Sequence, residues 1–370
     1  MPVIAKGLEN VIVDTSSICR IDGTAGRLIY RGYDINDLVN LSFEEVAFLL
    51  WNGELPTSKQ LADLQERFKK ERIIPEATKE WISRLPTTSN PLDSLRTIIS
   101  MMGSGLPLAK PNIDNAIAIT AKISTINAAF YRIRNNKEPI DPDPEYNHAE
   151  NYVHMMTGEK PDRKKAEALN KYLILLADHG MNASTFTARV VASTLSDMHS
   201  SITAAICALK GPLHGGAPAP VLRMLQDIGT PDRAEAWIKR ELDADRRLMG
   251  FGHRVYRTTD PRAEILRSIA SFDADTEFLN LAKHVEQTAL QLLHELRPRK
   301  KLYTNVEFYS AVVMHSIGFP PDLFTATFAA SRAVGWSAHV LEQVANNRLI
   351  RPEIEYTGPL DKTVKPLPQR

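Results

Sequence analysis

Apolar residues recur at helical spacing along most of this chain, and this period constrains the fold more than any other feature of the sequence. The clearest runs lie within residues 43–50, 169–176 and 281–296, where apolar side chains return every three or four positions. Ser42 and Glu45 form the S-x-x-E pattern of a capping box, so we expect a helix to begin just after Ser42. The sequence therefore predicts a mainly helical protein.

Signals for strands are few. Residues 185–209 are rich in Ala, Thr, Val and Ile but contain no Gly or Pro, and we interpret them as helix that is buried on most sides. Only residues 11–13 and 27–31, with glycine turns at residues 22–26, indicate a small hairpin. Because strands and helices do not alternate along the chain, a doubly wound sheet is not expected. We predict an all-α fold with a minor N-terminal β-hairpin.

Two breaks rich in glycine and proline predict the division into domains. One spans residues 211–220 and the other residues 318–321. If both are hinges, the chain between them forms a second domain that is inserted into the first, and 370 residues are enough for two domains. The predicted small, inserted domain spans residues 217–319. The predicted large helical domain comprises residues 1–216 and 320–370.

The balance of charge argues against several partners. Lys and Arg total 45 and Asp and Glu total 44, which leaves a net charge of +1; proteins that bind nucleic acid or an anionic membrane usually carry a clear basic excess. The longest apolar runs span about six residues, far fewer than a membrane-spanning helix needs. Cys19 and Cys207 are too few for a disulfide framework and lack zinc-site spacing. With no secretory signal visible, we expect a soluble, cytoplasmic protein.

Two histidines flanked by glycines are the strongest candidates for chemistry. His214 is followed by two glycines, and His253 follows Gly-Phe-Gly; glycine lets the backbone approach a ligand closely, and histidine exchanges a proton near neutral pH. Residues 249–262 add three arginines, the side chain best shaped to hold carboxylate or phosphate. Glu307 lies among apolar and aromatic residues, where partial burial would raise its pKa and make it a better base.

Together these segments resemble the citrate synthase family, in the shorter form typical of bacteria and archaea. Gly-Pro-Leu-His-Gly-Gly-Ala at residues 211–217 matches the first catalytic histidine motif of the family. Gly-Phe-Gly-His-Arg-Val-Tyr at residues 250–256, with Asp-Pro-Arg at residues 260–262, matches the second. Residues 305–310 lie where the family has its catalytic acid. The resemblance extends over residues 7–352, nearly the whole chain.

The resemblance implies an acyltransferase of the tricarboxylic acid cycle that joins acetyl-CoA to oxaloacetate and hydrolyses the thioester to give citrate and free coenzyme A. By matching position, Glu307 is the base that removes a methyl proton. His214 would stabilise the enolate at the thioester oxygen, and His253 would polarise the oxaloacetate carbonyl. One carboxylate and two imidazoles can cover these proton transfers, so neither a metal nor a permanently bound cofactor is expected.

The resemblance also implies the residues that hold the substrates and a partner subunit. The positions that match the carboxylate-binding residues are His179, Arg262, Arg332 and Arg351. In the family the last arginine reaches the site of the other subunit, so Arg351 implies a homodimer with shared active sites. Coenzyme A would bind along one short segment, with basic side chains near its phosphates; the residues are Arg247, Leu248, Met249, Gly250, Phe251, Arg257, Lys300 and Lys301.

One position departs from the family, which usually has aspartate where this chain has Glu307. The extra carbon–carbon bond adds about 1.5 Å. A catalytic group misplaced by about 1 Å can cost on the order of a hundredfold in rate. The glutamate leaves three explanations open: the local backbone compensates for its length, the enzyme is slowed, or the residue was substituted deliberately.

Three other functions compete with citrate synthesis. The nearest is 2-methylcitrate synthase, which uses propionyl-CoA, because one methylene in a pocket discriminates by only about 1–3 kcal/mol. A metal enzyme could use His179, His214 and His253 as ligands, although no H-E-x-x-H spacing supports it. A non-catalytic helical anion-binding protein would leave the cluster of arginines and histidines unexplained. We favour citrate synthesis.

Overall fold

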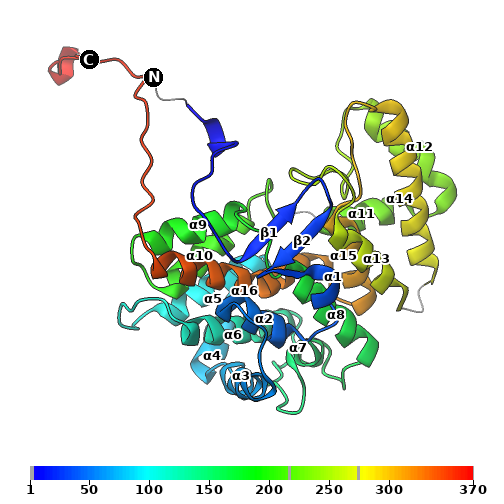
Figure 1. Cartoon of the computed structure of the whole chain (residues 1–370), viewed down its shortest axis with the longest axis horizontal. Helices are drawn as coiled ribbons and strands as arrows, with labels where there is room; N and C mark the ends of the chain where they lie inside the picture. The colour runs from blue at the N-terminus through cyan, green and yellow to red at the C-terminus, as the bar shows by residue number, and fades with distance from the viewer. Residues whose placement is uncertain (1–3, 216–217, 273–275, 370) are drawn as a thin grey trace.

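Helices make up most of the structure, a computed structural model that describes residues 4–215, 218–272 and 276–369 (Figure 1). This confirms the predicted all-α class. In chain order the helices are α1 (Ile35–Leu38), α2 (Phe43–Asn52), α3 (Ser58–Glu71), α4 (Glu76–Ser83), α5 (Pro91–Gly103), α6 (Ile113–Arg134), α7 (His148–Thr157), α8 (Arg163–Leu176), α9 (Ala183–Ser193), α10 (Met198–Leu209), α11 (Pro218–Ile228), α12 (Ala234–Asp243), α13 (Pro261–Ile269), α14 (Thr276–Leu296), α15 (Val306–Ile317) and α16 (Phe324–Ala345).

The three periodic runs of the sequence all form helices, namely α2, α8 and α14. The predicted capping box of α2 is present. The Ser42 hydroxyl accepts from the Glu45 amide at 3.3 Å, and the Glu45 carboxylate accepts from the Ser42 amide at 2.8 Å. These bonds satisfy amide groups that the first turn of a helix leaves unpaired, so the start of α2 is a local property of the sequence.

The prediction of one continuous helix over residues 185–209 is wrong. Two helices, α9 and α10, occupy this segment and pack against each other. Leu195 between them has a positive φ of 67°, and the Asp197 carboxylate caps α10 by accepting from the Ser200 amide at 2.9 Å. A cap formed by Asp and a residue in the left-handed region end the helix here without Gly or Pro, the two residues on which the prediction relied.

The predicted N-terminal hairpin is present, but with a different first strand. Strands β1 (Cys19–Asp22), β2 (Arg27–Tyr30) and β3 (Tyr33–Asp34) form an antiparallel sheet in the order β1-β2-β3. Cys19 pairs with Tyr30, and Asp22 pairs with Arg27 across the glycine turns. Residues 11–13 form no strand, because they precede the part of the chain that lies beside β2 and have no strand to pair with.

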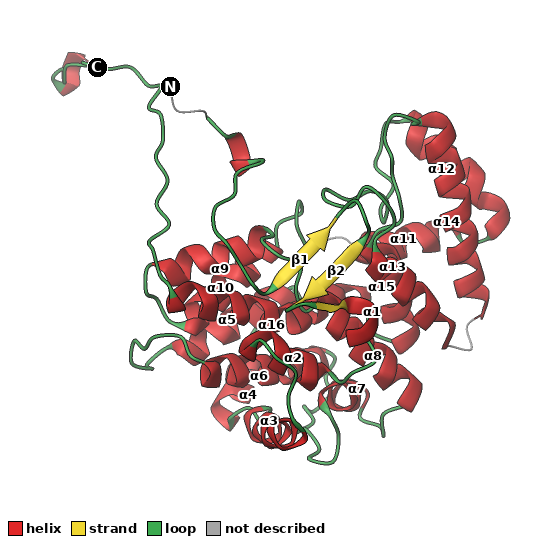
Figure 2. Ribbon diagram, viewed as in Figure 1, coloured by secondary structure: helices red, strands yellow, loops and turns green. Residues whose placement is uncertain are grey.

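Helix α16 runs through the centre of the molecule and is buried along most of its length (Figure 2). It packs against α6, α8, α9 and α10. At Gly335 the backbone amide donates to the Ala177 carbonyl at 3.0 Å, and a Cβ atom would lie 2.3 Å from that oxygen. Glycine is therefore required where α16 passes the end of α8, and this close packing holds Arg332 on a rigid element.

Helices α11 to α15 lie together to one side of this centre (Figure 1). Helix α12 packs on α14, α11 and α13 pack on α15, and α15 also contacts α8. The predicted domain boundary between residues 216 and 217 lies outside the described residues. The boundary between residues 319 and 320 falls in the turn that joins α15 to α16. The division into two domains stays a prediction.

Both ends of the chain leave the body as arms (Figure 1). Apolar side chains on them are open to solvent, with Ile12 90% and Ile354 93% exposed. Within the ranges that the structure describes, no helix combines the length and the apolar character needed to cross a membrane.

Candidate active site

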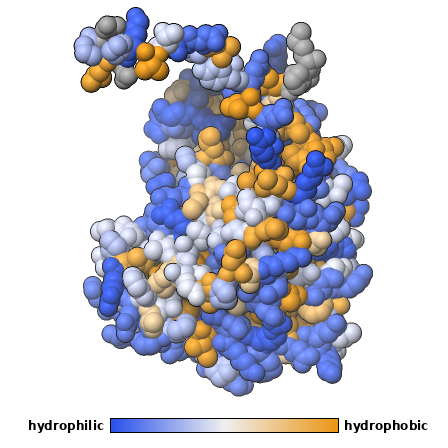
Figure 3. Space-filling view, turned by 90° about the vertical axis from the view of Figure 1, so that its left-hand side faces the viewer, coloured by the Kyte–Doolittle hydropathy of each residue, from blue (hydrophilic) through white to orange (hydrophobic). Residues whose placement is uncertain are grey.

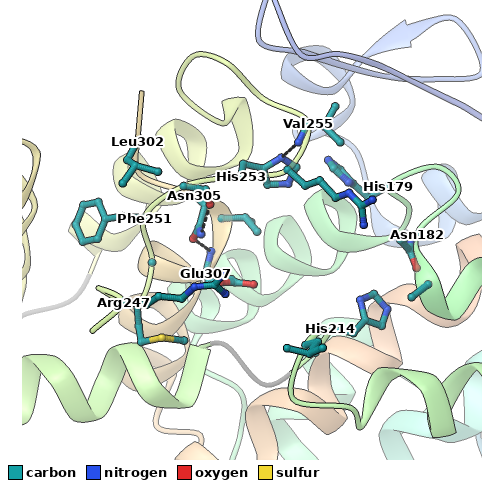
Figure 4. Close-up of a pocket in the computed structure, with 18 of the residues that line it drawn as sticks. His179, Asn182, His214, Arg247, Phe251, His253, Val255, Leu302, Asn305 and Glu307 are labelled. Atoms are coloured by element: carbon teal, nitrogen blue, oxygen red, sulfur yellow. Dashed lines mark hydrogen bonds between the residues drawn. The ribbon is translucent and has the colours of Figure 1, made fainter. Parts of the chain in front are cut away.

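A cleft of about 2080 Å³ opens between the hairpin, the start of α9 and the loops around residues 211–215 and 245–257. His179, His214, His253 and Glu307 face this common space from four separate segments of the chain (Figure 4). The cleft brings together most of the predicted site residues, which are His179, His214, Arg247, Leu248, Met249, Gly250, Phe251, His253, Arg257, Arg262, Lys300, Glu307 and Arg332.

Two predicted residues do not line the cleft of this single chain. Arg351 is exposed on the C-terminal arm, and Lys301 is exposed beside Lys300 but absent from the lining. The role predicted for Arg351 requires a second subunit, so it stays a prediction. Lys301 has no geometric support as a coenzyme residue.

His214 follows α10, and its ring orientation is set by Ser184. The Ser184 amide donates to Nε2 at 3.2 Å, and the Ser184 hydroxyl lies 2.8 Å from the same atom. Because an amide can only donate, Nε2 is the unprotonated nitrogen and the ring proton lies on Nδ1. Burial, reinforced by the charge of Arg332, lowers the pKa of His214 to about 4. The ring is therefore a neutral hydrogen-bond donor at pH 7.

His253 is held in the opposite tautomer. Its Nδ1 accepts from the Val255 and Tyr256 amides, both at 3.0 Å, so the ring proton lies on Nε2. Burial, followed by the charge of Arg262, lowers the pKa of His253 to about 4. This ring is also neutral at pH 7. Two imidazoles thus present N–H groups to the cleft with no positive charge of their own.

Glu307 lies in the first turn of α15 and is positioned by Asn305. The Asn305 side chain accepts from the Glu307 amide at 3.0 Å and donates to the Gly252 carbonyl at 2.9 Å. The Asn305 amide donates to the Gly250 carbonyl at 2.9 Å. These bonds tie the segment of Glu307 to the segment that precedes His253. Burial raises the pKa of Glu307 to about 7, which suits a general base near neutral pH.

Two buried arginines supply positive charge to the cleft. Arg262 forms two parallel bonds with Asp260, Nε to Oδ1 at 3.0 Å and Nη2 to Oδ2 at 2.8 Å. Although burial opposes it, the charge of Asp260 raises the pKa of Arg262 above its ordinary value. Arg332 donates from Nε to the Leu176 carbonyl at 2.6 Å and stacks on Phe328. Both guanidiniums are thus fixed in place before any ligand binds.

His179 lies beside His253, and the charges of both arginines act on it. Its ring stacks edge to face on His253, with the centroids 5.3 Å apart, and its Nε2 lies 3.4 Å from the Tyr256 hydroxyl. Burial, followed by the charge of Arg262, lowers the pKa of His179 well below its ordinary value. It is therefore a neutral, polar neighbour of the arginines, suited to donate to a bound carboxylate.

A second group of cations lines the cleft. Arg246 is paired there with Glu241, and Arg297 with Asp245. Apart from these two pairs and from Arg262 and Arg332, the cations of the lining form no ion pair within the described ranges. They are Arg223, Arg247, Arg254, Arg257 and Lys300. Unpaired cations in the cleft that holds His214, His253 and Glu307 are suited to a ligand with several phosphates.

No role was predicted from the sequence for five residues of this site, namely Asn182, Ser184, Arg223, Arg254 and Asn305. Asn305 stands at the head of the acid segment, and an Asn before a helix is a recognisable cap. Ser184 and Arg223 carried no such signal, because their roles depend on contacts with segments remote in the chain.

The residues around the cleft do not resemble a metal centre. Among the described residues no group of three or more His, Cys, Asp and Glu side chains is arranged to hold a metal ion. His253 Nδ1 and His214 Nε2 are already occupied by backbone amides. The geometry instead defines a class of enzyme that binds small polyanions and moves protons with one carboxyl group and neutral imidazoles.

Comparison with known proteins identifies the family within that class. The family model described as citrate synthase, C-terminal domain, matches residues 7–353. The chain is 45% identical to citrate synthase 2 of Bacillus subtilis over 99% of both chains. It is 38% identical to 2-methylcitrate synthase of Mycobacterium tuberculosis over 96% of this chain and 91% of that protein.

Solved structures agree. The ternary complex of citrate synthase from Thermoplasma acidophilum with carboxymethyl coenzyme A and oxaloacetate superposes with a TM-score of 0.93, at 35% identity over the full length of both chains. The chain belongs to the citrate synthase family, and it is an acyltransferase, as the sequence predicted.

Proposed function

We propose that this protein condenses acetyl-CoA with oxaloacetate and water to give citrate and free coenzyme A. The observation that carries the proposal is the convergence of Glu307, His214 and His253 on one cleft, with a carboxyl pKa of about 7 and two neutral N–H donors. The relatives support the same substrates, because they include citrate synthase 2 of Bacillus subtilis and a citrate synthase in complex with carboxymethyl coenzyme A and oxaloacetate.

In the first step Glu307 removes a proton from the methyl group of acetyl-CoA. His214 donates from Nδ1 to the thioester oxygen, where negative charge develops as the enolate forms. Because the pKa of His214 is about 4, its ring is neutral at pH 7. The neutral N–H group stabilises the charge of the enolate by donating a hydrogen bond. Burial makes the charged carboxylate of Glu307 less favourable than the protonated carboxyl group. It therefore raises the pKa of Glu307 and favours uptake of the methyl proton.

In the second step the enolate carbon attacks the ketone carbon of oxaloacetate. His253 donates from Nε2 to the ketone oxygen and passes it this proton as the carbon–carbon bond forms, so that the oxygen becomes the hydroxyl of the product and the ring regains a proton from solvent. Arg262 and Arg332, with His179, hold the two carboxylates of oxaloacetate and direct the ketone toward the enolate. Water then cleaves the thioester and releases the thiol of coenzyme A.

The unpaired cations of the cleft hold the coenzyme. Residues 247–251 follow the wall of the cleft, and their backbone is available to the adenine ring. Arg247, Arg257 and Lys300 supply charge for the phosphates, and Arg223 and Arg254 extend this set beyond the sequence prediction. No permanently bound cofactor is part of the proposal, because coenzyme A enters as a thioester substrate.

We also infer a homodimer in which Arg351 completes the site of the partner subunit. The arms that carry Arg351 and the N-terminus expose apolar side chains that the single chain leaves in solvent. Apolar patches gather on the face beneath the arms (Figure 3). Burial of such a surface against a second copy is favourable.

The small domain, residues 217–319, would close over the substrates by bending near residues 211–220 and 318–321. A location in the cytoplasm fits the bacterial and archaeal relatives.

Thiol release from acetyl-CoA in the presence of oxaloacetate tests the proposal. The wild-type protein should release thiol faster with acetyl-CoA than with propionyl-CoA, and the reverse preference would assign 2-methylcitrate synthesis. Glu307→Gln should lose turnover by at least about a hundredfold and still bind oxaloacetate. Glu264→Gln, an exposed carboxylate on neighbouring α13, is the matched control and should keep full activity. Near-normal turnover of Glu307→Gln would refute its role as base.

A further inference from the structure

A buried carboxylate lies behind the site and is not part of its lining. Glu286, on α14, is only 5% exposed. Its Oε1 accepts from the Thr304 hydroxyl at 2.7 Å, and its Oε2 accepts from the Tyr309 hydroxyl at 2.6 Å. Arg267, half exposed, approaches Oε2 at 3.4 Å. Glu286, Thr304 and Tyr309 are all absent from the cleft lining, so none of them is placed to touch a substrate.

The first partner, Thr304, belongs to the pair of segments that joins the catalytic groups. Thr304 and Phe251 form an antiparallel bridge. On one side of this bridge the Gly252 amide donates to the Tyr303 carbonyl at 2.7 Å, and on the other side the Asn305 amide donates to the Gly250 carbonyl at 2.9 Å. One segment continues to His253 and the other to Glu307. The bridge therefore sets the distance between the base and the imidazole that activates the ketone.

The second partner, Tyr309, lies on α15 two positions beyond Glu307. Thr304 and Tyr309 thus stand on either side of Glu307 in the chain, and one carboxylate binds both. The two hydroxyl bonds fix the turn that leads into α15 relative to α14. Because a catalytic group misplaced by about 1 Å can cost on the order of a hundredfold in rate, the position of this turn matters for Glu307.

The chemistry of the contact is more demanding than packing requires. Burial of a carboxylate in a protein interior is unfavourable unless hydrogen bonds replace its water. An apolar side chain would fill the same space without that cost, whereas charge-assisted hydrogen bonds are stronger and more directional than neutral ones. The arrangement is suited to holding two hydroxyl groups at defined positions.

We propose that Glu286 is a positioning residue for the catalytic base: through Thr304 and Tyr309 it holds Glu307 where it can remove the methyl proton, in fixed register with His253, which acts on the ketone in the next step. This inference rests on the proposed function, in which Glu307 removes the methyl proton. Glu286 acts only through these two residues and does not bind substrate.

Three variants test the inference by steady-state kinetics. Thr304→Val keeps the shape of the side chain and removes the hydroxyl, whereas Thr304→Ser keeps the hydroxyl. Glu286→Gln keeps the volume but forces one hydroxyl to accept a bond instead of donating it. Thr304→Val and Glu286→Gln should lower kcat by about tenfold to a hundredfold and leave KM for oxaloacetate within about twofold. Thr304→Ser should restore near wild-type kcat.

Two further measurements separate positioning from a purely structural role. With acetyl-CoA deuterated at the methyl group, the isotope effect on kcat should rise in Thr304→Val and Glu286→Gln, because proton removal becomes the slow step. In a Glu307→Gln background, Thr304→Val should cause no further loss, since no base remains to be positioned. Arg267→Met, which removes the half-exposed contact, is the control and should stay within about twofold of wild type.

Each outcome decides between the two proposals. If Glu307→Gln is inactive but Thr304→Val and Glu286→Gln keep wild-type kcat and isotope effect, this inference is wrong and the proposed function stands. A lower melting temperature with unchanged kcat would overturn the inference in the same way. If Glu307→Gln itself turns over normally, Glu307 is not the base and both proposals fall.

Discussion

Replacing Glu307 by Gln should change how the stability of the folded protein depends on pH. Burial raises the pKa of Glu307 from its ordinary value of 4.5 to about 7. The folded state therefore binds the Glu307 proton more tightly than the unfolded state does. The stability from this difference is fully present below pH 4.5 and is lost as the pH rises to about 7, where the folded protein must bury a charged carboxylate.

The size of the effect follows from the two pKa values. At 1.36 kcal/mol per pH unit, a rise from 4.5 to about 7 corresponds to about 3 kcal/mol, an upper bound because the carboxyl group opens on the cleft. About 2.5 kcal/mol of this should develop between pH 5 and pH 8. With an unfolding entropy of about 2.1 cal/mol/K per residue, a chain of 370 residues would shift its melting temperature by about 3 °C.

Thermal unfolding of both proteins at one subunit concentration measures this directly. Gln resembles protonated Glu and does not titrate, and every other group contributes equally to both proteins. The melting temperature of Glu307→Gln minus that of the wild type should therefore rise by about 3 °C between pH 5 and pH 8. A difference that stays constant, or that falls with pH, would refute the assignment of a raised pKa to Glu307.

Two further predictions concern the hairpin and the proposed dimer. At Gly23 a Cβ atom would lie 2.3 Å from the Val255 carbonyl oxygen, so Gly23→Ala should displace the loop that orients His253. In the thiol-release assay kcat should fall by about tenfold or more. An unchanged kcat would show that the hairpin does not position the loop. Inactive Arg351→Ala and Glu307→Gln homodimers, when mixed and exchanged, should regain about a quarter of wild-type activity, because hybrid dimers contain one intact site. If Arg351 serves its own subunit, mixing restores nothing.

The helical class and the chemical motifs could be predicted because both are local. Helical period needs only the neighbours of a residue within a few turns, and a capping box such as Ser42 with Glu45 needs four consecutive positions. The motifs around His214, His253 and Glu307 indicated the proposed reacting groups for the same reason. The prediction that the hairpin begins at residues 11–13 was wrong, because strand formation depends on a partner strand, which no local pattern supplies.

The break inside residues 185–209 shows where local rules reach their limit. Leu195 adopts a positive φ that its side chain disfavours, and α10 then folds back on α9. Tertiary packing offsets such a cost, so the absence of Gly and Pro was not sufficient evidence for a continuous helix.

The sequence by itself determined the fold class, the family motifs that contain the proposed catalytic groups, and the arginines that accompany them. Only the tertiary structure decided which nitrogen of each imidazole carries a proton, how far burial moves each pKa, and that Glu286 binds both Thr304 and Tyr309. These properties arise from contacts between segments far apart in the chain, such as the amides that face His214 and His253. Hydrogen-bond direction and loss of water depend on three-dimensional surroundings, and a linear pattern does not contain them.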